Sequence, residues 1–146
     1  MPEPIWFVTA RQELGRVEIP GEQDNQRIVE YHSATDLHAK DDETPWCSAF
    51  VNWCFKQNNI AGTNKANARS WLTWGDEIQE PRLGCVAVLW RESPNSAKGH
   101  VAFYVGPDPA RPSKITLLGG NQGDAVATTP YDRARVLSYR WPTGQV

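Results

Sequence analysis

The cysteine at position 47 stands where a helix is expected to begin, and a thiol in that position can act as a nucleophile. Thr44 is a favourable N-cap residue, and the fixed φ of Pro45 suits the first helical position. We therefore expect Cys47 in the first helical turn, where free backbone N–H groups and the positive end of the helix dipole stabilise a thiolate. Because the thiolate is the nucleophilic form of cysteine, this placement indicates acyl-transfer chemistry.

The same cysteine has a simpler interpretation. Phe50, Val51, Trp53 and Cys54 follow at helical spacing, so the segment has an apolar face to bury. Cysteine is often no more than a small buried apolar residue on such a face. A catalytic role for Cys47 therefore requires a base elsewhere in the chain.

His100 and Asn121 supply the two residue types that would complete this chemistry. His100 opens an expected strand at 100–105, and Asn121 lies in a glycine-rich turn after the next expected strand, 115–118. A cysteine nucleophile works with an adjacent imidazole, and a third polar group fixes the tautomer of that imidazole. Taken singly, each residue has an ordinary alternative, namely a histidine at the protein rim and an asparagine in a turn. Together they make cysteine-based acyl chemistry the leading hypothesis.

The elements that must position these residues change character near residue 84. Helical patterns precede that point and β-rich segments follow it. The expected helices, besides the one at Cys47, are 4–14, 25–34 and 65–74. The expected strands are 86–90, 100–105, 115–118 and 136–141, with a further short one at 126–128. Helices followed by strands with short loops predict an α+β fold in which the helices pack on an antiparallel sheet.

The length suits one domain over residues 1–146, with a helical half at about 4–75 and a β half at about 84–141. An apolar fraction of 40% and seven tryptophans indicate a folded core. The net charge of −2, without a basic run, argues against nucleic-acid binding. No apolar run approaches the roughly 20 residues of a membrane helix, so we expect no membrane insertion.

The three cysteines are expected to be free thiols. Cys47 and Cys54 share a helix face but are separated by about 10 Å of helical rise, too far for a disulfide. No ligand spacing predicts a metal site, so neither a metal nor another cofactor is expected. His32 and His38 have no fixed spacing to a partner, and we expect both at the surface or rim.

Three segments resemble a known family. Residues 46–51 (WCSAFV), 99–106 (GHVAFYVG) and 118–122 (LGGNQ) look like the CHAP branch of the NlpC/P60 cysteine peptidases, in particular its small single-domain bacterial and phage members. The similarity runs from about residue 6 to residue 141. It implies a papain-like α+β fold and cleavage of an amide bond in bacterial peptidoglycan. It also implies Cys47 as nucleophile, His100 as base and Asn121 as the polar third member.

One position departs from the family pattern. Such proteins usually carry Gly-Asp before the first main strand, whereas this chain has Gly84-Cys85. An aspartate can bond the turn and a cysteine does so less well, which puts local stability in question more than catalysis. We expect Cys85 to be structural.

The functional hypothesis is a peptidoglycan amidase or endopeptidase with a Cys-His-Asn mechanism, in which Trp46, Trp71 and Gln122 contact the substrate. Two alternatives remain open: a protein transamidase or deamidase on the same fold, and a non-catalytic wall-binding module. The amino terminus lacks the basic and apolar regions of a secretory signal. We therefore expect synthesis in the cytoplasm and action on the wall after release, as a phage lysis enzyme or as an antibacterial effector with a cognate immunity protein.

Overall fold

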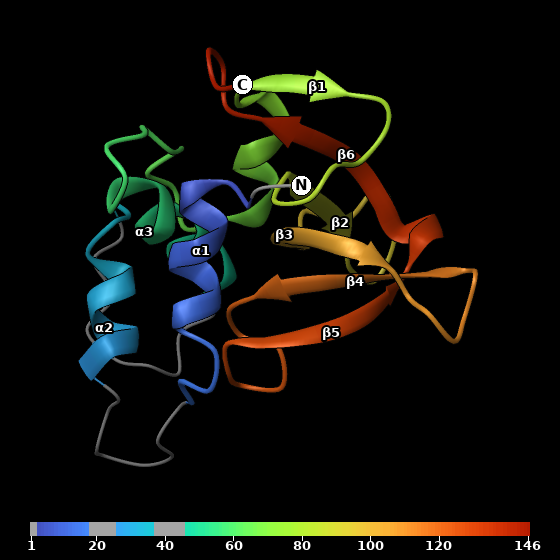
Figure 1. Cartoon of the computed structure of the whole chain (residues 1–146), viewed down its shortest axis with the longest axis horizontal. Helices are drawn as coiled ribbons and strands as arrows, with labels where there is room; N and C mark the ends of the chain where they lie inside the picture. The colour runs from blue at the N-terminus through green and yellow to red at the C-terminus, as the bar shows by residue number, and fades with distance from the viewer. Residues whose placement is uncertain (1–2, 18–25, 37–45) are drawn as a thin grey trace.

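The computed structural model describes residues 3–17, 26–36 and 46–146. Helical elements come first along the chain: α1 (Ile5–Gln12), α2 (Gln26–His32), α3 (Cys47–Lys56) and the 3₁₀ helix η1 (Ala68–Thr73). The remainder is mainly β: β1 (Asp76–Ile78), β2 (Val86–Trp90), β3 (Gly99–Pro107), β4 (Lys114–Gly119), β5 (Ala127–Asp132), the short 3₁₀ helix η2 (Arg133–Arg135) and β6 (Val136–Trp141). Figure 1 shows α1, α2 and α3 gathered on one side of the strands.

The strands form one six-stranded sheet in the order β1-β6-β2-β3-β4-β5, and every neighbouring pair is antiparallel. Strand β3 lies in the interior of the sheet, with His100 opposite Leu89 of β2 and Phe103 opposite Leu118 of β4. The predicted α+β class, with helices on an antiparallel sheet, is confirmed.

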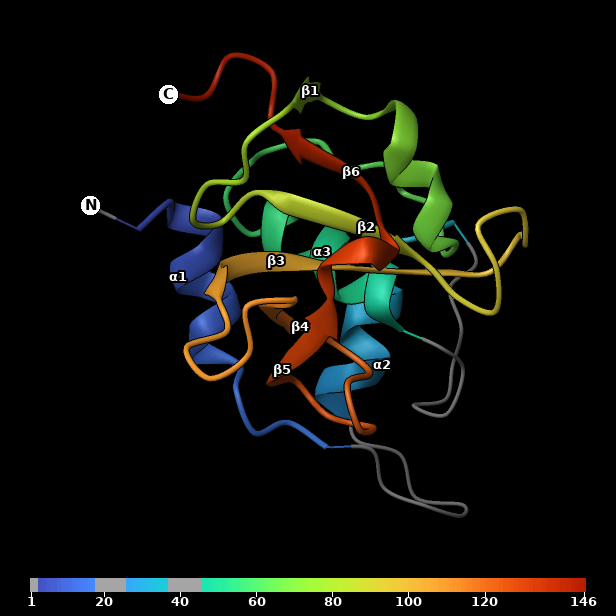
Figure 2. The ribbon, with the colours of Figure 1, turned by 90° about the vertical axis from the view of Figure 1, so that its right-hand side faces the viewer.

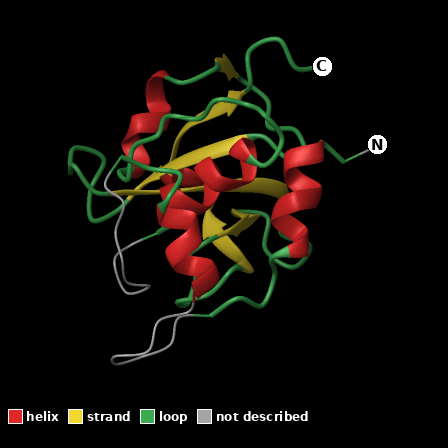
Figure 3. Ribbon diagram, turned by 90° about the vertical axis from the view of Figure 1, so that its left-hand side faces the viewer, coloured by secondary structure: helices red, strands yellow, loops and turns green. Residues whose placement is uncertain are grey.

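Helix α3 is the element that joins the two halves. Every residue from Cys47 to Phe55 is buried, so the helix presents no polar face to water. It packs against β3 and β4 on one side and against α1 and α2 on the other, and Figure 3 shows the helices lying over one face of the sheet. Phe55 makes an edge contact with Phe103 of β3 at 5.6 Å between ring centroids. Helix α3 is therefore packed between the sheet and the other two helices.

The helix that carries Cys47 begins slightly later than expected. Cys47 is the first residue of α3, and Trp46 is its N-cap residue with φ −129°. Thr44 and Pro45, which we expected to start the helix, lie outside the described residues. The expectation that Cys47 lies in the first turn is confirmed.

Other differences follow from tertiary contacts that local patterns do not contain. The 65–74 segment forms only η1, whose tryptophan Trp71 is held by a bond to Ser48 of α3. Strand β1 is mostly polar and pairs with β6 through its backbone. Its sequence has no apolar alternation from which a strand could be predicted. His32 was expected at the rim but is fully buried, because it lies on the inner side of α2. His38 lies outside the described residues.

In the parts of the chain that the structure describes, none of the helices has the length and apolar character needed to cross a lipid bilayer.

Candidate active site

Cys47 and His100 meet where the start of α3 faces the start of β3. The Cys47 thiol is hydrogen-bonded to the His100 imidazole and to the backbone of Val101 and Ser48. Burial raises the pKa of Cys47, but the hydrogen bond and charge of His100, together with the backbone bonds, outweigh that effect, so the pKa lies below its ordinary value. Cys47 keeps 8% of its surface exposed, whereas Cys54 and Cys85 keep none. The structure therefore combines thiolate stabilisation with residual access at Cys47.

Gln122 holds the other side of the imidazole. Its Oε1 lies 3.0 Å from His100 Nε2. Its own amide nitrogen donates to the carbonyl oxygens of Leu117 at 3.1 Å and Ala127 at 2.7 Å. Because both donors are used in this way, Oε1 must be the atom that faces the ring, and it can only accept. His100 Nε2 therefore carries the proton, which leaves Nδ1 as the ring nitrogen available to Cys47.

Asn121 does not make the bond that was expected of it. In the described part of the chain it shares no hydrogen bond with His100, and the acceptor that was predicted at position 121 is provided at position 122. Asn121 has φ 57°, in the left-handed region that Asn tolerates, and the side chain of the next residue, Gln122, lies buried beside His100. Gln122 was expected to contact substrate, but at 3% exposure it is a buried partner of the base.

Tyr131 is a further member of the site that sequence reasoning missed. Its ring stacks on the His100 imidazole with centroids 5.1 Å apart and an interplanar angle of 25°. Its hydroxyl oxygen lies 3.3 Å from His100 Nε2. Burial, and next the charge of Cys47, raise the pKa of Tyr131 to about 12, so the hydroxyl stays protonated at neutral pH. The sequence predicted only a short strand at 126–128, whereas β5 pairs with β4 as far as Asp132 and so includes Tyr131.

The two glycines before Asn121 allow this loop to approach the helix. A Cβ on Gly120 would lie 2.7 Å from Phe50 Cβ and from the Trp46 ring. A Cβ on Gly119 would lie 2.7 Å from Gln122 Oε1, the atom that faces His100. Side chains at these positions would therefore push the loop away from both α3 and the imidazole.

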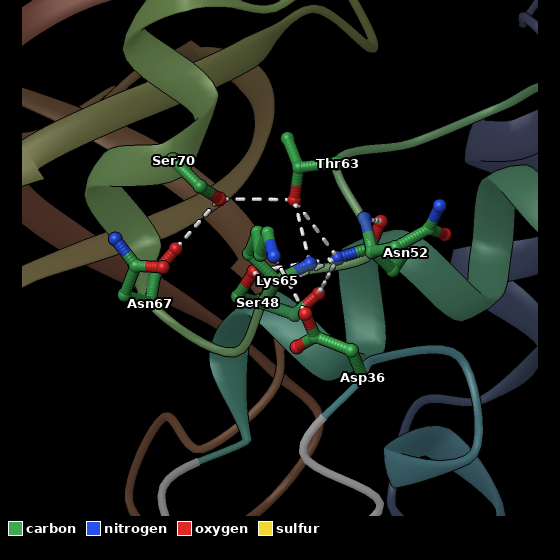
Figure 4. A network of polar contacts seen from close by, with 8 residues as sticks. Asp36, Ser48, Asn52, Thr63, Lys65, Asn67 and Ser70 are labelled. Carbon is green, nitrogen blue, oxygen red and sulfur yellow. Dashed lines mark hydrogen bonds and ion pairs between the residues drawn. The ribbon is translucent and has the colours of Figure 1, made fainter.

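A polar network anchors the start of α3 to the loop that follows the helix (Figure 4). Ser48, the residue after the nucleophile, donates to the carbonyl oxygen of Lys65 at 2.6 Å and accepts from Trp71 Nε1 at 2.9 Å. One turn later, Asn52 donates to Thr63 Oγ1 at 3.3 Å and its Oδ1 accepts the Asn64 N–H at 2.9 Å. These buried and part-buried bonds fix the helix end that carries Cys47.

A family model for the CHAP domain matches residues 39–121, more than half of the 146-residue chain. The chain belongs to the CHAP domain family. The matched segment contains Cys47 and His100 and ends at Asn121, so it stops just before Gln122 and does not reach Tyr131. CHAP domains act generally as hydrolases of peptidoglycan, with cysteine or amidase chemistry. No curated protein matches this chain.

Two of the residues that we expected to contact substrate have no exposed surface in this CHAP domain. Trp46 and Trp71 are both fully buried. Trp46 packs on Tyr31 at 5.8 Å between centroids, and Trp71 is bonded to Ser48 and packed on Phe55. The expectation that these tryptophans touch substrate is therefore wrong for this structure, because their rings build the support beneath Cys47.

The remaining two cysteines differ chemically from Cys47. Burial raises the pKa of the Cys54 thiol, and burial raises that of Cys85 to about 12. The turn at Gly84-Cys85 is closed by backbone bonds in both directions with Tyr104, each 2.8 Å long, and Trp6 Nε1 donates to Gly84 O at 2.7 Å. The turn is thus well bonded although it lacks the aspartate usual in such proteins.

Among the residues that the structure describes, no group of three or more His, Cys, Asp or Glu side chains is arranged to hold a metal ion.

Proposed function

We propose that this CHAP domain cleaves an amide bond of the wall peptide with Cys47 as the nucleophile, His100 as the general acid and base, and Gln122 as the residue that positions His100. The observation that carries the proposal is the continuous set of contacts from the Cys47 thiol through the imidazole to the Gln122 amide. The same order of nucleophile, base and acceptor defines thiol acyl transfer in general.

In the first half-reaction the Cys47 thiol gives its proton to His100 Nδ1, and the sulfur attacks the carbonyl carbon of the scissile amide. The resulting oxyanion can be stabilised by the Cys47 N–H, which as the first helical N–H has no acceptor inside α3. The imidazolium then returns the proton to the nitrogen of the leaving amine. The C–N bond breaks and a thioester between Cys47 and the acyl group remains.

In the second half-reaction a water molecule replaces the amine. His100 takes a proton from the water, the hydroxide attacks the thioester carbonyl, and the C–S bond breaks. The acid is released, and the proton returns to sulfur. Throughout this cycle Nε2 keeps its hydrogen because Gln122 Oε1 accepts it, so Nδ1 alone exchanges protons.

Tyr131 and Gln122 restrain the imidazole in two directions. Gln122 bonds the ring in its plane, while Tyr131 covers one ring face. A base held in this way stays within reach of both the thiol and the leaving amine. Neither residue touches the reacting atoms, so both act as positioning residues.

Purified peptidoglycan is the substrate for the test. The wild-type protein should release new amino groups, and mass analysis of the fragments identifies the amide bond. Cys47→Ala should release none while remaining folded, and Cys54→Ala and Cys85→Ala should retain substantial activity. EDTA should leave activity unchanged, whereas thiol alkylation should abolish it. Full release by Cys47→Ala, or inactivation by EDTA that added zinc reverses, would contradict the mechanism.

The place of action is also part of this proposal. An enzyme of this kind meets its substrate only outside the cytoplasmic membrane, as a phage lysis enzyme or a delivered antibacterial effector would. Production of the chain in bacteria with and without an added export signal tests this. Lysis with the signal, and only with Cys47 intact, is the expected result. Lysis by the Cys47→Ala variant would contradict it.

A further inference from the structure

Arg135 lies between two aromatic rings beside the proposed site. It ends η2, the turn between β5 and β6 that lies next to the end of β2 in Figure 2. Its guanidinium carbon is 5.6 Å from the centroid of the Trp90 ring and 5.7 Å from that of Tyr131. Nε and Nη2 both donate to the carbonyl oxygen of Trp90, at 3.1 and 3.0 Å. The guanidinium is therefore held in place by protein groups that carry no charge.

This cation has no ion-pair partner among the described residues. The acid closest to it in sequence, Asp132, bonds Lys114 at 2.7 Å instead. Arg135 Nη1 makes no hydrogen bond within the described part of the chain, so one edge of the guanidinium remains unused. Arg91, exposed after the end of β2, adds a second positive charge near Tyr131. Lys114 lowers the pKa of Asp132 most and the charge of Arg135 contributes to this shift, but no carboxylate of the described residues forms an ion pair with Arg135. A fixed arginine with an unused edge is suited to an anionic ligand.

The position of Arg135 relates it directly to the proposed base. Tyr131, which contacts the guanidinium, stacks on the His100 imidazole. Trp90, which contacts it from β2, pairs in the sheet with Gly99, the residue before His100. Arg135 and the imidazole thus contact the same ring, that of Tyr131.

We propose that Arg135, walled by Trp90 and Tyr131, forms a subsite for a carboxylate of the peptide stem next to the scissile amide. The proposal rests on the proposed function, because it assigns part of the same substrate. Stem peptides of bacterial walls carry free carboxylates on acidic residues close to their amide bonds, and some walls carry them amidated. Arginine binds carboxylates through paired, charge-assisted hydrogen bonds. The two rings limit the water and the rotamers that compete with such a contact.

The test measures binding in the inactive Cys47→Ala background, so that it does not depend on hydrolysis. The probes are a synthetic stem peptide with all carboxylates free and the same peptide with every carboxylate amidated. The free peptide should bind about tenfold tighter, which corresponds to about 1.4 kcal/mol. Adding Arg135→Gln should remove most of this preference by weakening the free peptide only.

Arg133→Gln is the matched control. Arg133 belongs to the same η2 and carries the same charge, but its guanidinium bonds Pro112 O and lies near Tyr104 and Tyr139, away from His100. It should keep the tenfold preference. Thermal melting reports whether each variant folds. If Arg135→Gln does not fold, Arg135→Lys replaces it in the test. Lysine keeps the charge without the paired donors, so this variant should retain only part of the preference.

Four results would overturn the subsite: no binding of either peptide, no preference in the Cys47→Ala background, an unchanged preference when folded Arg135→Gln or Arg135→Lys is added, and equal losses in the Arg133 and Arg135 variants. Failure of the proposed function would look different. In that case the carboxylate preference would persist and depend on Arg135, but the wild-type protein would release no amines from peptidoglycan.

Discussion

Gln122 Oε1 accepts from His100 Nε2 at 3.0 Å, and the amide that carries this oxygen is locked by the carbonyls of Leu117 and Ala127. The lock matters because a freely rotating amide could present its NH₂ group and favour the opposite tautomer of the imidazole. The backbone carbonyls of β4 and β5, through Gln122, thus determine which ring nitrogen faces Cys47. The tautomer of the imidazole is therefore fixed by Gln122 and not by the thiol.

Gln122→Ala should lower kcat on the order of 10²-fold, because the imidazole loses the acceptor that fixes its tautomer. Asn121→Gly is the matched variant, since glycine tolerates the φ of 57° and removes only the side chain. It should keep activity within a few-fold of the wild type. The pH dependence of Cys47 alkylation should move to higher pH in Gln122→Ala and stay in place in Asn121→Gly. An activity loss in Asn121→Gly as large as that in Gln122→Ala would assign the role to position 121 instead.

Tyr131→Phe and Tyr131→Ala separate the two contacts of this side chain with His100. Phenylalanine keeps the stacked ring and loses only the 3.3 Å hydroxyl contact, so kcat should fall a few-fold at most. Alanine removes the stacking as well, worth about 0.5–1.5 kcal/mol, and should cost about tenfold. Steady-state rates across pH 5–9 check this. If both variants behave as the wild type does, Tyr131 has no positioning role.

The parts of the site that were predictable from sequence are those governed by local rules. Helical spacing after Cys47 indicated the helix, although its N-cap is Trp46 and not Thr44, and the onset of β3 placed His100 at a strand end. Their meeting then required only that the helices lie on the sheet. The choice between Asn121 and Gln122 was not accessible, because it depends on the backbone angle of one residue in a turn. Tyr131 was missed for a different reason: it reaches His100 through the pairing of β5 with β4, a contact between distant segments.

The tryptophans illustrate the same limit. Trp46 precedes Cys47 in the chain and Trp71 is bonded to Ser48, the residue after it, but substrate contact does not follow from such proximity. Trp46 is covered by Tyr31 of α2, and Trp71 is covered by Ser48 and Phe55 of α3, which are contacts between segments that are separated in the chain. Side-chain exposure is set by tertiary packing and not by distance from a catalytic residue.

Asn52→Ala should destabilise the protein by about 1–3 kcal/mol, because the Asn64 N–H loses its acceptor and the buried Asn52 side chain loses its bonds to Ser48 O and Thr63 Oγ1. Asn59→Gly is the control, since Asn59 is exposed in a loop with φ 58°. Urea unfolding should show a lower midpoint for Asn52→Ala and a nearly unchanged one for Asn59→Gly. Equal midpoints in all three proteins would mean that the network of Figure 4 does not stabilise the helix start.

The most direct measurement of the central claim is the rate at which iodoacetamide labels each cysteine of the folded protein between pH 5 and 8. His100 and the backbone bonds lower the pKa of Cys47, whereas burial raises those of Cys54 and Cys85. Since only the thiolate reacts, Cys47 should be labelled first at mildly acidic pH. His100→Ala should move the Cys47 labelling curve to higher pH and leave the other two cysteines unchanged. Equal labelling of the three thiols, or a Cys47 curve that does not respond to the loss of His100, would contradict the proposed thiol mechanism.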